Sequence, residues 1–426
     1  MQAKKMLVIA APGQGAQTPG FLAPWLEFTG VADRLGAWSD LVGYDLIKAG
    51  TVGSAAEIRD TAVAQPLLVA AALAAAGVLG IGPSLTGEQQ SGQDGRADGP
   101  QQPGHRDGHH SGIAAGHSVG ELAAGAIAGV IASQDALRLV GVRGRAMAAA
   151  AAAEQTSMTA VLGGDEAGVL RSIEAHGLTP ANINGAGQIV AAGTAAQLAA
   201  FAADPPAGAR LRPLPVAGAF HTAHMAPAVD ALRAQAAAVT VQNPVLTVLS
   251  NRDGAVVRTG ADWLERICGQ VSTPVRWDSC MATMRNLGAT AFLELPPSGP
   301  LTGLARRALP GVRVLAVKTP DDLEAARAML AEHDLHSDSH PPGWRLLVAP
   351  LAGTFRSAAA PDGPGVSVVS GAELGRVEMR GDSHRVTAGF PATIIEWLVE
   401  DGDPVSPGQP LVRLDPAIHA ATKKGH

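Results

Sequence analysis

The segment Gly116-His117-Ser118-Val119-Gly120-Glu121 gives the strongest indication of fold in this chain. A short apolar strand pattern at 111–115 precedes it, and a helical pattern at 122–130 follows it. Strand, tight Gly-x-Ser-x-Gly turn and helix form the layout of a nucleophile elbow, where a Cβ at either glycine would clash with the strand or the helix. The serine then lies at the positive end of the helix, which suits attack on a carbonyl group. The pattern predicts an α/β fold with a parallel sheet.

The composition sets limits on the classes of protein to consider. The chain has 426 residues, of which 46% are apolar but only 3% aromatic, so we expect more than one domain and a core of small side chains. The net charge of −6 leaves no general basic surface for nucleic acid. Cys268 and Cys280 do not have a zinc-site spacing and are expected to be buried thiols of a cytosolic protein.

Two apolar segments are too short for a leader or a membrane span. The run Leu7–Ala11 is shorter than the apolar region of a signal peptide and stops at Pro12. The run between Pro66 and Pro83 is shorter than the roughly 20 residues that cross a bilayer, so we interpret it as a buried helix that opens at Gln65. These patterns predict a cytoplasmic protein without membrane contact.

Residues 1–332 alternate strand and helix signals, as expected for one α/β domain. Residues 84–110 are rich in Gly, Gln, Asp, Pro and His, which predicts a low-complexity surface insertion. Its histidines sit in so flexible a composition that we expect no metal site there. Residues 156–217 show a β-α-β-β-α-β order, which predicts an inserted ferredoxin-like subdomain.

The C-terminal part has a different character. Residues 333–363 are rich in His, Ser, Pro, Gly and Ala and are interpreted as a linker, whereas 364–416 predict a small all-β domain. The segment 400–411 is similar to one half of a biotinyl or lipoyl carrier domain. Such carriers hold a modifiable lysine on an exposed hairpin, but the matching stretch here, 378–383, contains arginine and no lysine. The resemblance implies a carrier-like fold without a carried group.

Five motifs in order resemble one family over about residues 5–320, apart from the insertion. They are Gly13-Gln14-Gly15-Ala16-Gln17, Gly116-His117-Ser118-Val119-Gly120-Glu121, Val142-Arg143-Gly144-Arg145-Ala146-Met147, Ala219-Phe220-His221-Thr222-Ala223-His224-Met225 and Pro274-Val275-Arg276-Trp277. This set is similar to malonyl-CoA:acyl carrier protein transacylases and to the acyltransferase domains of polyketide synthases. The resemblance implies an α/β-hydrolase-like core with the ferredoxin-like subdomain inserted in it.

The resemblance also implies catalytic roles. Ser118 matches the family's nucleophile and His221 its general base. A serine hydrolase orients its histidine with a carboxylate, but Asp165, Asp204 and Asp230 do not lie at obvious strand ends. In the family a backbone carbonyl orients the histidine, and the matching position is Gln270. A missing acid suits an acyl-enzyme that waits for a thiol and does not activate water.

The glycine-rich loop at 13–17 suits an oxyanion hole. Glycines at 13 and 15 let the backbone approach an ester oxygen closely, so we expect the N–H groups of Gln14 and Val119 to hold the oxyanion. As a phosphate loop the segment is weak, because it has no Gly-Lys-Ser/Thr and no third glycine.

Arg143 is the residue that we expect to set substrate choice. An arginine in a run of Ala, Val, Leu and Met either extends to solvent or pairs with a carboxylate, and its planar fork fits a carboxylate with two hydrogen bonds. The resemblance implies that it holds the free carboxylate of malonate. Gln65 and Asn184 match further substrate-binding positions, and Asn182 is a weaker candidate.

The implied reaction is transfer of malonyl from malonyl-CoA to the phosphopantetheine thiol of acyl carrier protein, for fatty acid or polyketide synthesis, with no metal or organic cofactor. Two other classes remain open. A serine esterase or thioesterase would have an Asp within hydrogen-bond reach of His221. A non-enzymatic carrier or scaffold, led by the C-terminal domain, would carry biotin or lipoate.

Overall fold

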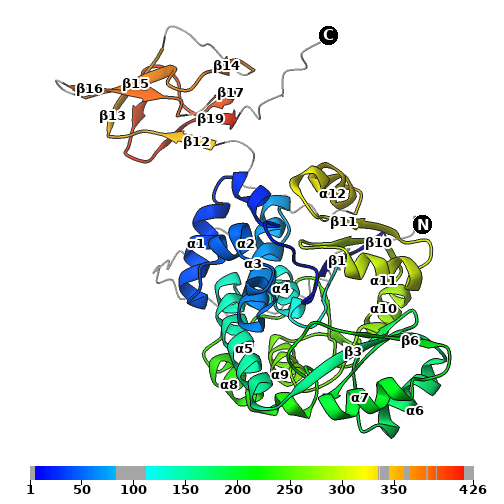
Figure 1. Ribbon diagram of the computed structural model, residues 1–426. Helices are drawn as coiled ribbons and strands as arrows, with labels where there is room; N and C mark the ends of the chain where they lie inside the picture. The colour runs from blue at the N-terminus through cyan, green and yellow to red at the C-terminus, as the bar shows by residue number, and fades with distance from the viewer. Residues whose placement is uncertain are drawn as a thin grey trace, which may run out of the picture. The chain divides into compact units, whose positions relative to one another are not determined.

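The computed structural model describes residues 5–82, 112–333, 335, 345–358, 365–379, 382–389 and 391–416 (Figure 1). The chain forms two compact units, Met1–Ser337 and Asp338–His426. The expected insertion at 84–110 lies outside the described residues.

A six-stranded sheet organises the first unit, in the order β11-β10-β1-β2-β7-β8. All neighbouring strands are parallel except the pair β7–β8, which confirms the predicted parallel sheet. Along β1, Leu7 and Ile9 belong to one buried cluster and Val8 and Ala10 to another, so both faces of the sheet are covered. The strands are β1 (Met6–Ala11), β2 (Gly112–Gly116), β7 (Thr247–Leu249), β8 (Val256–Val257), β10 (Ala289–Glu294) and β11 (Arg313–Ala316).

Helices cover this sheet, and the long helices α3 and α5 pack against each other. The α-helices are α1 (Val31–Val42), α2 (Leu46–Val52), α3 (Thr61–Leu79), α4 (Gly120–Ile127), α5 (Ser133–Ala153), α8 (Ala226–Ala236), α9 (Gly260–Gln270), α10 (Trp277–Asn286), α11 (Pro300–Ala308) and α12 (Leu323–Ala331). Short 3₁₀ helices are η1 (Ala23–Glu27), η2 (Glu57–Arg59), η3 (Ala223–Met225) and η4 (Pro320–Asp322).

Helix α3 is a core helix that begins earlier than the sequence pattern indicated. It begins at Thr61 and not at Gln65, because the Asp60 side chain accepts a hydrogen bond from the Ala62 N–H and caps the helix there. It is long and apolar enough to cross a membrane, but 78% of its most apolar window is buried inside the protein. Its apolar surface is therefore covered by neighbouring helices.

The inserted subdomain has the predicted β-α-β-β-α-β order, and its sheet runs β6-β3-β5-β4-β9. The first four strands are antiparallel neighbours, and β9 joins β4 in parallel. Because β9 lies between α9 and α10 in the chain, a segment from outside the subdomain pairs with the edge of its sheet. The elements are β3 (Thr156–Gly163), α6 (Glu166–Ala175), β4 (Thr179–Gly185), β5 (Gln188–Thr194), α7 (Ala195–Ala203), β6 (Ala209–Pro213) and β9 (Val275–Arg276).

The second unit consists of two four-stranded antiparallel sheets, β12-β19-β17-β14 and β16-β15-β13-β18. Phe355, Val377 and Leu411 belong to one of its buried clusters, and Ile394 and Leu414 to the other. The strands are β12 (Arg345–Val348), β13 (Gly353–Ser357), β14 (Ser367–Val368), β15 (Glu373–Met379), β16 (Asp382–Thr387), β17 (Ala392–Trp397), β18 (Pro404–Val405) and β19 (Pro410–Pro416).

The prediction of a linker over all of 333–363 is wrong, because this segment contains two strands of the second unit, β12 and β13. Short strands joined by turns are rich in the same Gly, Pro, Ser and Ala as a linker, so composition did not separate the two. Phe355 of β13 is buried, which shows that this segment contributes to the core.

Candidate active site

Ser118 lies at a tight, strained turn between β2 and α4. Its φ is +54°, a left-handed conformation that is unusual for a residue with a side chain. A Cβ on Gly116 would lie 2.0 Å from the carbonyl carbon of Gly120, and one on Gly120 would lie 2.2 Å from the Ala11 carbonyl oxygen. Only glycine fits these two positions. The geometry is that of the predicted nucleophile elbow.

His221 reaches the serine from the loop before η3. Its Nε2 lies 2.7 Å from Ser118 Oγ, and its Nδ1 lies 2.9 Å from the Gln270 carbonyl oxygen. A carbonyl only accepts hydrogen bonds, so Nδ1 carries the proton and Nε2 is free to accept from the serine hydroxyl. Like Ser118, His221 has a left-handed backbone, with φ of +61°. Strained residues of this kind cluster at functional sites.

The surroundings of His221 keep it neutral. Burial, and after it the positive charge of Arg143, lowers the pKa of His221 to about 3, although the hydrogen bond to the Gln270 carbonyl opposes this. No carboxylate among the described residues forms a hydrogen bond with the imidazole. A neutral imidazole that faces a hydroxyl can act as a general base.

Arg143 extends from α5 to the same serine and is only 1% exposed. Its Nη1 donates to Gln65 Oε1 at 2.6 Å, and its Nη2 donates to Gln270 Oε1 at 2.8 Å. Nη2 also lies 3.3 Å from Ser118 Oγ. Burial lowers the pKa of Arg143 to about 10, with an opposing effect from the charge of Glu121, so the guanidinium stays charged at neutral pH. A buried cation therefore stands beside the Ser118 hydroxyl.

The two amides expected to bind substrate have different places. Gln65, from α3, holds Arg143 and also contacts Met147 Sδ at 3.5 Å through Nε2. Asn184, from β4, contacts His117 Nε2 at 2.9 Å through Oδ1 and donates to Gln188 at 3.1 Å. His117 in turn packs edge-on against Trp277. Gln65 is therefore linked to Ser118 by way of Arg143, which contacts both residues. Asn184 contacts His117, the residue directly before Ser118.

The backbone N–H groups of Gln14 and Val119 are available for an acceptor. Neither makes a hydrogen bond to any residue in the described part of the chain. A Cβ on Gly13 would lie 2.9 Å from both Nδ1 and the carbonyl oxygen of His117, so the loop after β1 packs directly against the elbow. The loop position of Gln14 is thus next to the turn that contains Val119.

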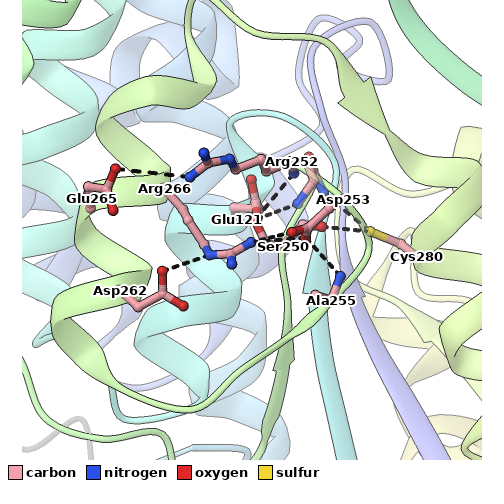
Figure 2. A network of polar contacts seen from close by, with 10 residues as sticks. Glu121, Ser250, Arg252, Asp253, Ala255, Asp262, Glu265, Arg266 and Cys280 are labelled. Carbon is pink, nitrogen blue, oxygen red and sulfur yellow. Dashed lines mark hydrogen bonds and ion pairs between the residues drawn. The ribbon is translucent and has the colours of Figure 1, made fainter.

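Two further polar residues stand behind the elbow and were not singled out from sequence. Asn251 Oδ1 accepts from the Ser118 N–H at 2.7 Å, and the Glu121 carboxylate accepts from the Asn251 N–H at 2.9 Å and from the Gln270 side chain. Burial raises the pKa of Glu121 to about 8, although these donors and the charge of Arg143 oppose it. Figure 2 shows Glu121 beside the turn that Ser250 and Asp253 form. A polar residue directly after the buried strand β7 was the available signal for Asn251.

The described residues contain no group of three or more His, Cys, Asp and Glu side chains arranged to hold a metal ion. Both cysteines are free and buried, as expected.

Comparisons with known proteins identify relatives of this chain. A family model described as an acyl transferase domain matches residues 105–338. The malonyl CoA-acyl carrier protein transacylase of Mycobacterium tuberculosis (strain H37Rv) is 50% identical over 319 residues, which are 75% of this chain and 98% of that protein.

Solved structures give the same result. The crystal structure of MCAT from Mycobacterium tuberculosis has a TM-score of 0.67 and 47% identity, and it covers 78% of this chain and 100% of its own. A malonyl-transacylase solved in complex with a type II PKS acyl-carrier protein has a TM-score of 0.65 and 29% identity, over 76% and 100%. The chain belongs to the malonyl CoA-acyl carrier protein transacylase family of acyltransferases.

Proposed function

We propose that this chain transfers the malonyl group of malonyl-CoA to the phosphopantetheine thiol of acyl carrier protein through an ester on Ser118. One observation carries the proposal: Ser118 Oγ lies 2.7 Å from His221 Nε2 and 3.3 Å from Arg143 Nη2. A nucleophile with a base on one side and a cation on the other suits an acyl donor that carries a carboxylate. The names of the relatives and the solved complex with a carrier protein support the same two substrates.

The first half-reaction forms the acyl-enzyme. Ser118 Oγ attacks the thioester carbonyl carbon while its proton passes to His221 Nε2. The oxyanion accepts hydrogen bonds from the Gln14 and Val119 N–H groups, which have no other acceptor in the described part of the chain. The carbon–sulfur bond then breaks, and coenzyme A leaves as a thiol with the proton from His221.

The second half-reaction runs through the same groups. The carrier thiol gives its proton to His221 as its sulfur attacks the ester carbonyl. The bond between the carbonyl carbon and Ser118 Oγ breaks, and Oγ takes the proton back. Throughout, Arg143 holds the distal carboxylate, and Gln65 and Gln270 hold Arg143 in place.

The partner of His221 favours transfer over hydrolysis. Its Nδ1–H faces the Gln270 carbonyl, which stabilises an imidazolium less than a carboxylate does. Activation of water by His221 is therefore weaker than in a hydrolase triad, and the ester persists until a thiol arrives.

The finer features of the fold are assigned with the function. The order of the main sheet and the elbow support an α/β-hydrolase-like core, with residues 1–337 as the transferase domain. The paired four-stranded sheets of 338–426 support a biotinyl- or lipoyl-like unit, in which β15 and β16 form the hairpin where carriers have their lysine. Arginine occupies this stretch in the sequence, so we assign no carried group. We place the reaction in the cytoplasm and assign it no metal or organic cofactor.

The test is to mix the full chain with labelled malonyl-CoA, quench in acid, digest, and locate the label by peptide mass. We expect one label on the peptide that contains Ser118 and its transfer to added phosphopantetheinylated carrier protein. Ser118→Ala should abolish the label, and Ser157→Ala, which removes a hydroxyl of β3 that donates to the Val216 carbonyl, should not.

Three results would contradict the proposal. A label that persists in Ser118→Ala would exclude the assigned nucleophile. Steady release of coenzyme A in the absence of any carrier thiol would identify a thioesterase. A mass increase equal to biotin or lipoate on the purified chain would instead support the carrier class.

A further inference from the structure

Asn251 lies two residues beyond β7 and is fully buried, and its side chain binds the elbow at Ser118 and at Gly116, two residues earlier. Its Oδ1 accepts from the Ser118 N–H at 2.7 Å. Its Nδ2 donates to the Gly116 carbonyl oxygen at 2.8 Å. One amide therefore satisfies a donor at the strained residue and an acceptor two residues before it.

The main chain of Asn251 is held as firmly as its side chain. Its N–H donates to Glu121 Oε1 at 2.9 Å, and its carbonyl oxygen accepts from the Arg276 N–H at 2.7 Å. Glu121 belongs to the helix that the elbow begins, and Arg276 belongs to β9. All polar groups of Asn251 thus bind elements around the site, so the residue has little freedom to move.

The turn that carries Asn251 is itself braced. Figure 2 shows the Arg266 guanidinium between Asp253 and Asp262, with Cys280 on the other side of the turn. Arg266 Nη1 lies 2.9 Å from both Asp253 carboxylate oxygens, and Cys280 Sγ donates to the Ser250 carbonyl at 3.3 Å. The turn that contains Asn251 is therefore itself held in place by an ion pair and a hydrogen bond.

The elbow needs such an anchor, because Ser118 is held at φ +54°. Residues in this region persist only when the surroundings determine them, and relaxation would swing Oγ away from His221 Nε2. We propose that Asn251 is a positioning residue for the transfer reaction, which holds Ser118 Oγ in line with its base. The inference rests on the proposed role of Ser118 as nucleophile.

The test compares Asn251→Ala with two controls in the full chain. Ser250→Ala removes a neighbouring side chain that accepts only from the Arg252 N–H, and Asn243→Ala removes an asparagine that accepts from the Gly260 N–H. Each protein is treated with labelled malonyl-CoA and, separately, with a small uncharged fluorophosphonate. That reagent bonds phosphorus to Oγ, releases fluoride and passes the serine proton to the base, without using Arg143.

A positioning role predicts a specific split of the rate constants. In Asn251→Ala the acylation rate at saturating malonyl-CoA should fall by about 10²-fold, as expected for a misplacement of about 1 Å. The fluorophosphonate rate should fall in the same proportion. The malonyl-CoA concentration that gives half the maximal rate should change by less than about threefold, because the carboxylate site is untouched. Both controls should match the wild type.

Asn251→Asp covers the case in which the alanine variant melts below the assay temperature. It keeps an oxygen for the Ser118 N–H but loses the donor to the Gly116 carbonyl, so the same split is expected. A folded variant at Asn251 that reacts with both reagents at the wild-type rate would overturn the inference. So would a loss confined to the half-saturating concentration. If the wild type is labelled by neither reagent at Ser118, the proposed function fails instead.

Discussion

Replacement of Arg143 by alanine should change which acyl group the enzyme accepts. In the structure, the guanidinium is 1% exposed and is bonded to Gln65 and Gln270, with Ser118 Oγ 3.3 Å away. A malonyl ester on Ser118 would place its carboxylate within a few bonds of that cation. A hydrogen bond to a charged group contributes about 1.5–3 kcal/mol, so kcat/KM for malonyl-CoA should fall by about ten- to 150-fold.

The same change should favour acetyl-CoA. This donor has no carboxylate, so in the wild type the guanidinium remains desolvated without a new partner beside the ester. Removal of the charge relieves that mismatch, and the ratio of acetyl to malonyl transfer should rise by at least the factor lost for malonyl. The variant should also melt at a lower temperature, because the side-chain amide oxygens (Oε1) of Gln65 and Gln270 lose their donor.

The assay is competition between the two donors, with products on the carrier protein separated by mass. Arg145→Ala is the matched control, since this exposed arginine lies two residues along α5 and, within the described part of the chain, bonds to the Val42 carbonyl alone. It should leave the ratio unchanged. A parallel fall of both donors in Arg143→Ala, with an unchanged ratio, would refute the carboxylate role and leave Arg143 as a structural residue.

Four further predictions concern the groups around the serine and the need for the second unit. His221→Ala should slow acylation by about 10²–10⁴-fold, and because the pKa of His221 lies near 3, the wild-type rate should lose no activity to its protonation between pH 7 and 5; a rate that follows an ordinary histidine pKa would contradict this. For the same reason, the unfolded chain binds a proton at His221 below pH 6.5 and the native protein does not. This residue should therefore lower the free energy of unfolding of the wild type by about 1.4 kcal/mol for each pH unit below 6.5, as measured by urea unfolding. The dependence on pH should be smaller in His221→Ala. Glu121→Gln should lower the melting temperature and reduce the preference for malonyl-CoA over acetyl-CoA, since its amide nitrogen must face a donor of Asn251 or Gln270. An unchanged ratio of acetyl to malonyl transfer would mean that Glu121 does not influence the carboxylate site at Arg143. A chain that ends at Ser337 should retain transfer, because it keeps the whole first unit, including the hydrogen bond between His333 and Thr290. Loss of solubility in this truncated chain would mean that the second unit is required for the fold.

Much of the site could be predicted from sequence because its main residues lie in short contiguous patterns. The Gly-x-Ser-x-Gly pattern indicates the turn from sequence, since a Cβ on Gly116 would already clash within the turn, and the strand and helix that flank it follow from hydrophobic periodicity. Arg143 stands out as a charge within an apolar helical run. The βαββαβ order of the subdomain is likewise a matter of local propensity.

The remainder depends on tertiary placement. Asn251 acts on Ser118 from 133 positions away, and nothing local tells a reader that β7 ends behind the elbow. Glu121 was visible in the elbow motif, but its role comes from Gln270 and Asn251, which the fold alone brings to it. The boundary of the second unit was misplaced because turns between short strands have the composition of a linker.

The left-handed backbone at both Ser118 and His221 has an evolutionary consequence. Each conformation costs on the order of 1–3 kcal/mol that glycine would not incur, so the backbone at both residues is held against its own preference. Selection for the proposed transfer must therefore retain these two side chains in spite of that cost. At the partly exposed Ser118, replacement by glycine should raise the melting temperature as it removes transfer.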